Sequence, residues 1–105
     1  MSIERRHAPR YRLVADAEIM IPHSSTSFKA RTSDVSILGC FMNTTHALTP
    51  GTQIRLHLAY GGATLDATAA VARSEPSMGF GIAFSKLNPA QQTLLQSWLA
   101  GLTPA

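Results

Sequence analysis

Residues 53–73 read QIRLHLAYGGATLDATAAVAR, and this stretch decides the fold. Apolar residues occupy every second position of 54–58 and alternate with polar ones, which is the period of a strand with one buried face. A second alternating run follows over 64–73. The dipeptide Gly61-Gly62 lies between the two runs, and glycine adopts positive φ at no steric cost. The centre of the chain is therefore predicted to be a β-hairpin.

Further strand patterns lie on both sides of this hairpin. They cover 11–21, 28–36 and 40–43 before it and 79–84 after it. Residues that favour turns separate these runs, as Pro50-Gly51 does in front of the hairpin. About six short antiparallel strands usually close into a small barrel, because closure leaves no exposed edge strand.

The end of the chain has the pattern of a helix. Asn88 is a favourable N-cap, and Pro89 suits the first helical turn, where its missing N–H costs nothing. Five apolar residues then recur at helical spacing, and Gly101 is a suitable stop. We therefore predict an all-β fold with a C-terminal helix: a six-stranded antiparallel β-barrel plus one terminal α-helix. The expected single domain of residues 1–105 divides into an arm (1–10), a barrel (11–85) and a helix (88–101).

Length and composition fit an ordinary single domain. At 105 residues the chain is long enough to fold without disulfides or metals. Its one cysteine, Cys40, excludes an internal disulfide and fits a reducing compartment. No apolar run reaches the roughly 18–20 residues that span a bilayer, and the basic N-terminus lacks the apolar stretch of a secretory signal. A cytoplasmic protein without a membrane span is expected.

The net charge of +3 belongs to the first twelve residues, where four arginines stand against Glu4. The rest of the chain holds five basic and five acidic side chains, which cancel. Proteins that bind long duplexes more often spread basic charge over a whole face. Charge gathered on one short segment suits a small anionic partner, or a solvated tail.

The four arginines are Arg5, Arg6, Arg10 and Arg12, and Arg6 and Arg10 have the spacing RxxxR. On an extended arm they can wrap around a ligand. Guanidinium groups bind phosphate oxygens and the O6/N7 edge of guanine in the same forked geometry, and they stack on aromatic planes. A guanine nucleotide offers all of these features, although a lone RxxxR more often belongs to a solvated basic tail.

A second short pattern, Asp34, Ser36 and Gly39, follows about two dozen residues later. On a strand, Asp34 and Ser36 would point to the same face, because the side-chain period is two. An aspartate can accept from guanine N1–H and N2–H2 together, and a serine hydroxyl can donate to a phosphate or base acceptor. Gly39 would let the backbone bend or let a ligand approach closely. Taken alone, the pattern also fits a turn or a β-bulge.

No competing chemistry is predicted. The histidines at 7, 23, 46 and 57 lack the spacing of a metal site and are expected at the surface, with no metal or cofactor. Cys40 lies in a short apolar run and is expected to be buried. No serine has a credible base nearby in the sequence, and Trp98 is expected to pack the helix on the barrel. We expect a protein that is not an enzyme.

The segments RRHAPR (5–10) and DVSILG (34–39) together resemble the paired signature of the PilZ domain family, bacterial receptors for the second messenger cyclic di-GMP. The stretch MGFGIAFSKLNPAQQTLLQSWL (78–99) resembles the last strand, turn and helix of such domains. The resemblance thus covers nearly the whole chain, and it implies a six-stranded barrel whose arginine arm folds over a ligand on the barrel surface.

Carried over by position, the resemblance makes Arg6 and Arg10 the motif arginines and Asp34, Ser36 and Gly39 the residues on the barrel. Arg5, just before the first motif arginine, resembles the type that holds an intercalated pair of ligands. Arg12 lies outside the motif, and its expected place is a solvent-facing strand position. The implied receptor orders its arm on binding and relays the signal to an effector protein in trans.

Two other functions are also compatible with this sequence. One is a small barrel that binds nucleic acid, with the arm on phosphates, although the strands lack exposed aromatics at alternating positions and charge outside the arm is balanced. The other is a PilZ-like module for protein interaction that has no nucleotide ligand. The presence of every motif position argues against the second.

Overall fold

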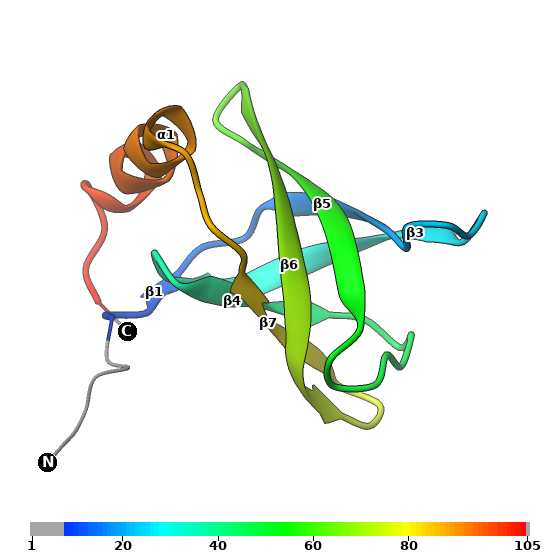
Figure 1. The fold of residues 1–105 in the computed structure, drawn as a ribbon. Helices are drawn as coiled ribbons and strands as arrows, with labels where there is room; N and C mark the ends of the chain where they lie inside the picture. Colours follow the sequence, from blue (N-terminus) through cyan, green and yellow to red (C-terminus); the bar gives the residue numbers. More distant parts are fainter. Residues whose placement is uncertain (1–7, 105) are drawn as a thin grey trace, which may run out of the picture.

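The computed structural model describes residues 8–104 of the chain. Within them, six strands form a closed antiparallel barrel in the order β3-β2-β5-β6-β7-β4, and β4 pairs back onto β3 (Figure 1). A short extra strand, β1, pairs with the end of β3, and the single helix α1 follows the last strand. The predicted fold class is confirmed. The strands are β1 (Tyr11–Arg12), β2 (Asp16–Met20), β3 (Ser27–Val35), β4 (Gly39–Asn43), β5 (Gln53–Tyr60), β6 (Ala63–Glu75) and β7 (Gly79–Phe84).

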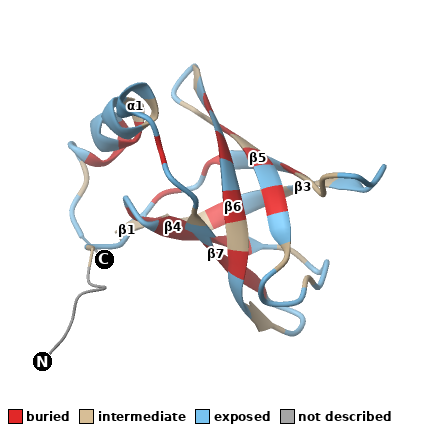
Figure 2. Ribbon diagram, in the orientation of Figure 1, coloured by how far each residue is buried: buried red, intermediate tan, exposed pale blue. Residues whose placement is uncertain are grey.

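The central hairpin forms as predicted. β5 and β6 pair in continuous register as far as Tyr60 opposite Ala63. Between them Gly61 and Gly62 have φ of 60° and 81°, the left-handed values of a tight two-residue turn. The alternating apolar residues of both strands are buried (Figure 2). Leu58 lies opposite Leu65 in register.

The predicted first strand is divided in two. We expected one strand over 11–21, but β1 ends at Arg12 and β2 begins at Asp16. The buried Thr32 of β3 causes the break: its hydroxyl donates to Leu13 O at 2.6 Å and accepts from Ala15 N at 2.9 Å. A side chain thus takes the place of regular ladder hydrogen bonds, while the burial alternation continues through the break.

Thr32→Val is expected to destabilise the fold by about 2 kcal/mol, because the isosteric side chain leaves the carbonyl of Leu13 and the N–H of Ala15 buried without partners. Urea denaturation measures the free energy of unfolding. Thr68→Val is the matched control, since Thr68 lies on the exposed face of β6. Equal effects of the two substitutions would contradict a structural role for the Thr32 hydroxyl.

The helix α1 (Pro89–Leu99) begins where the sequence predicts and ends two residues before the expected 101. Asn88 accepts from Gln91 N at 2.8 Å, and the Gln91 side chain accepts from Asn88 N at 2.7 Å, which together form a capping box. Trp98 packs edge-on against Tyr60 of β5, as expected for a helix that packs on the barrel. Within residues 8–104, no helix is long and apolar enough to cross a membrane.

Candidate functional site

The two halves of the sequence motif meet at Arg10 and Asp34. The guanidinium donates from Nε at 3.0 Å and from Nη2 at 2.6 Å to the same carboxylate oxygen of Asp34. The meeting follows from topology: β1 pairs with the end of β3 and brings Tyr11 opposite Val35, so the residue before β1 reaches the Asp34 side chain. Both side chains are partly exposed, at 50% and 30%, so the pair can still contact a ligand.

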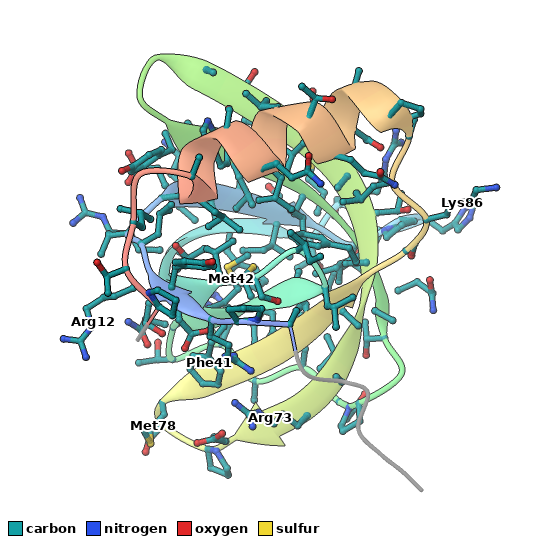
Figure 3. All side chains as sticks on the ribbon, turned by 90° about the vertical axis from the view of Figure 1, so that its left-hand side faces the viewer. Arg12, Phe41, Met42, Arg73, Met78 and Lys86 are labelled. Carbon is teal, nitrogen blue, oxygen red and sulfur yellow. The ribbon has the colours of Figure 1, made fainter. Side chains whose placement is uncertain are left out.

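Of the three other arginines near the N-terminus, the structure describes only Arg12. Arg5 and Arg6 lie outside the described residues. Arg12 lies on β1, opposite Asp34 in register, but its exposed side chain extends away from the molecule into solvent (Figure 3). This is the solvent-facing position that the sequence predicts for Arg12.

Ser36 does not lie on the strand as predicted, because β3 ends at Val35. The serine is buried, and its hydroxyl accepts from the backbone N–H groups of Leu38 at 3.0 Å and Gly39 at 3.3 Å. Its own N–H donates to Gly39 O at 2.8 Å. Ser36 therefore stabilises the turn that joins β3 to β4, and the condition of the same-face prediction, a strand that includes both Asp34 and Ser36, is not met. Any ligand bond from this hydroxyl must be made alongside its bonds within the turn.

Gly39 begins β4 at a point of very close approach between two backbones. A Cβ at this position would lie 1.9 Å from the carbonyl oxygen of Ile82 on β7. Only glycine fits against β7 here. A glycine inside a strand often marks such a close approach of another backbone. The sequence left open whether Gly39 serves backbone bending or a ligand; the structure adds this third requirement.

A lateral row of residues crosses four strands beside the Arg10–Asp34 pair. In register, Asp34 of β3 lies opposite Phe41 of β4, Phe41 opposite Gly81 of β7, and Gly81 opposite Arg73 of β6. Neighbouring strands are about 4.8 Å apart, so Asp34 and Arg73 lie about 14 Å apart across the outer barrel surface. An ion pair lies at each end of the row. Asp34 pairs with Arg10 at one end, and Arg73 pairs with Glu75 at the other, where Arg73 Nε lies 3.4 Å from Glu75 Oε2.

A hollow of about 390 Å³ lies over this part of the barrel. Arg10 and Ser36 border it from the motif side and Arg73 from β6. Small residues from three strands form much of its lining: Gly39, Ala72, Gly81 and Ala83. Its volume is within the range of roughly 300–1,000 Å³ typical of small-molecule sites. A floor of small side chains between two guanidinium groups suits a flat, anionic ligand.

Sequence reasoning missed Arg73 and its neighbours. The alternation in β6 places Val71 inside, so Arg73, two residues later, would also point inward. A β-bulge between Val71 and Arg73 adds one residue, and both Ala72 and Arg73 are exposed as a result. The pairing of Arg73 with Gly81 on the outer surface depends on this bulge, and nothing in the local sequence of β6 predicts it.

Cys40 lies behind this surface, on the inner face of β4, and is buried as predicted. Burial raises the pKa of its thiol, and the nearby Asp34 carboxylate raises it further, while Arg10 lowers it. The thiol thus stays protonated at neutral pH and behaves as a small apolar side chain.

A larger depression of about 810 Å³ lies over β2, β3 and β5, on a different part of the surface. Its charged residues include Asp16 and Arg31, which form an ion pair of 3.2 Å with both side chains mostly exposed. Among the motif residues that the structure describes, none lines it. It has the character of a solvated barrel face, and the hollow at the Arg10–Asp34 pair is the better candidate site.

Comparison with known proteins gives a consistent result. A family model described as the PilZ domain matches residues 4–101. The chain is similar to the PilZ domain of CeSA from a cellulose-synthesizing bacterium, with 18% identity over 88% of this chain and 95% of that one, at a TM-score of 0.71. It is also similar to the PilZ domain of YcgR from Escherichia coli, solved with c-di-GMP, with 14% identity over 94% and 92% at a TM-score of 0.77.

A third similar structure is the inhibitor of motility MotI/DgrA of Bacillus subtilis, with 19% identity and a TM-score of 0.73. The match covers 91% of this chain but only 50% of that protein. At such identities the likeness of these structures concerns the fold alone. No curated protein sequence matches the chain.

Proposed function

Because this chain belongs to the PilZ domain family, as the sequence resemblance implied, we propose that it is a non-catalytic receptor for cyclic di-GMP. The observation that carries the proposal is the contact between Arg10 and Asp34, which joins the two motif halves at the border of a small-residue hollow. The ligand has two phosphates and two guanine bases, so it matches a site that combines guanidinium groups, a carboxylate and a flat floor.

The proposed division of roles follows from the chemistry of each group. A guanidinium carries five N–H donors, and Asp34 accepts from two of the nitrogens of Arg10, so Arg10 can bind a phosphate or a guanine edge without releasing Asp34. Asp34 is the acceptor for guanine N–H groups. Ser36 and Gly39 hold the turn and the strand junction that form the border of the hollow. By position, Arg6 is the other arginine of the RxxxR motif, four residues before Arg10.

Isothermal titration calorimetry with cyclic di-GMP tests the proposal, and we expect saturable heat in the micromolar range or tighter. Cyclic di-AMP is the matched control, because an Asp34 that accepts from guanine N1–H and N2–H2 disfavours adenine. The alternatives give other outcomes. Heat with a single-stranded oligonucleotide and none with the dinucleotide would favour a nucleic-acid-binding barrel, and no heat with either would favour an interaction module.

The relay to an effector protein is proposed to act through the arm. Ordering roughly eight residues costs on the order of 1–2 kcal/mol each at most, which the ligand contacts must offset. The base of the arm lies beside the end of the helix: Tyr11 forms a β-bridge with Pro104, and Pro9 borders a small hollow together with Leu99. An arm that the ligand orders over the site would thus form one surface with the helix end, which a partner in trans can recognise.

Arg5 tests whether the ligand binds as an intercalated pair. We expect wild-type protein to bind two molecules of cyclic di-GMP per chain and Arg5→Leu to bind one, because an extra guanidinium can stack on or bond to a guanine of the second molecule. The calorimetric ratio of ligand to protein measures this directly. The paired-ligand hypothesis fails if the wild-type ratio is one, or if the variant keeps a ratio of two.

A further inference from the structure

Arg73 lies outside both sequence motifs, yet its side chain is held on the surface that forms the site. Its guanidinium carbon lies over the Phe41 ring, 5.5 Å from the centroid, and its Nε lies 3.4 Å from Glu75 Oε2. Figure 3 shows Arg73 and Phe41 close together on one face of the barrel. A surface arginine with two such contacts is fixed in position more firmly than a freely solvated one.

The backbone around Arg73 is shaped to accommodate this side chain. The β-bulge in β6 turns Arg73 outward. Opposite it, Gly81 has no side chain, and a Cβ there would lie 3.2 Å from Arg73 Nε and 3.4 Å from its Cγ. The aliphatic stem of Arg73 therefore lies across the space that Gly81 leaves free. Bulge and glycine together lay the arginine flat along the surface, over the ring of Phe41.

Arg73 and Arg10 border the same hollow from two sides. The strands between them contribute the small residues Gly39, Gly81 and Ala83 to the lining. Phe41 is buried beneath Arg73, whereas the Arg73 side chain itself is 55% exposed. The guanidinium carbon thus lies over an aromatic ring, and the group remains accessible to a ligand in the hollow.

We propose that Arg73 is a further ligand-contacting residue of this site and that its guanidinium stacks on a guanine base, with Phe41 supporting it from below. The inference rests on the proposed function. A planar guanidinium stacks on aromatic planes on either face, whereas an ammonium group lacks that plane. Arg10 then attracts the phosphates and Arg73 holds a base at the far side of the hollow.

The test is calorimetric titration of cyclic di-GMP into wild type, Arg73→Ala, Arg73→Lys and the control Arg55→Ala. Arg55 is an exposed arginine of β5 that borders a different depression. We expect Arg73→Ala to weaken binding by about tenfold. Arg73→Lys, which keeps the charge and the stem but not the plane, should recover little of that loss, and Arg55→Ala should bind like wild type. If Arg73→Ala fails to fold, Arg73→Lys carries the test.

The outcomes separate the two levels of the argument. A wild type that does not bind cyclic di-GMP overturns the proposed function. A wild type that binds, together with an Arg73→Ala variant within twofold of it, overturns the role of Arg73 alone. Full recovery of affinity in Arg73→Lys means that Arg73 acts by charge, and the stacking proposal is then wrong. A loss in Arg55→Ala equal to that in Arg73→Ala would point to a general charge effect and would also overturn it.

Discussion

Arg10→Ala is expected to weaken cyclic di-GMP binding by about 100-fold or more, because charge-assisted hydrogen bonds each contribute about 1.5–3 kcal/mol and tenfold in affinity corresponds to about 1.4 kcal/mol. The variant loses the donors that the proposal assigns to the phosphates and the guanine edge. It also leaves the Asp34 carboxylate without its partner, and a bare carboxylate repels a dianionic ligand. Both effects act in the same direction.

The fold should tolerate this substitution. Arg10 lies outside the regular strands, and its ion pair with Asp34 is half-exposed, so the pair contributes about 0–1 kcal/mol to stability. Arg12→Ala is the matched control, since it removes the same charge two residues away, where the side chain points into solvent (Figure 3). Calorimetry measures affinity, and thermal unfolding followed by circular dichroism checks the fold. Equal losses in the two variants would mean that arm charge alone, and no specific contact of Arg10, attracts the ligand.

The parts of the fold that depend on local sequence could be predicted. The β5–β6 hairpin requires positive φ at Gly61 and Gly62, and alternation fixes which residues face the barrel. The helix start follows from Asn88 and Gln91, whose side chains each accept from the other's backbone N–H in the capping box. Each signal acts over a few residues, so the sequence alone is sufficient to read it.

The parts that depend on contacts across strands could not be predicted. The break between β1 and β2 arises because the Thr32 hydroxyl, from another strand, replaces ladder bonds at Leu13 and Ala15. The bulge in β6, which turns Arg73 outward, likewise exists only in its pairing with β7. The period of two fails only at the bulge, where Ala72 and Arg73 are both exposed, and the burial alternation continues through the break between β1 and β2.

The candidate site divides in the same way. That Arg10 and Asp34 belong together was predicted from the family resemblance, and the structure brings them into contact. The predicted strand over 28–36 extends one residue beyond β3, which ends at Val35. The prediction therefore assigned Ser36 to a strand, whereas it lies in the following turn. Arg73 was missed because strict alternation places its side chain inside the barrel, where it could not contact a ligand on the surface.

Gly39→Ala is expected to destabilise the domain by about 3 kcal/mol or more, because overpacking against a backbone that cannot yield costs at least as much as overpacking among side chains. The added Cβ would lie 1.9 Å from Ile82 O and 3.2 Å from the Cα of Ala83. Hydrogen bonds on both sides hold this junction in place, from Ser36 N to Gly39 O at 2.8 Å and from Phe84 N to Leu38 O at 2.8 Å. Relief therefore requires β4 and β7 to separate.

Gly101→Ala is the matched control, because nothing lies within 4 Å of a Cβ at that position, and its effect should stay within about 1 kcal/mol. Denaturant titration gives the free energy of unfolding of both variants, and calorimetry at a temperature where both are folded gives their affinities. A Gly39→Ala variant with wild-type stability and lost binding would show that the glycine serves ligand approach alone. A variant that loses stability, but still binds cyclic di-GMP with near wild-type affinity once folded, would place its role in the junction of β4 with β7. In that case Gly39, the last residue of the motif, acts on the site indirectly. It holds β4 against β7 and so fixes the border of the hollow, to which Arg10 and Ser36 also belong.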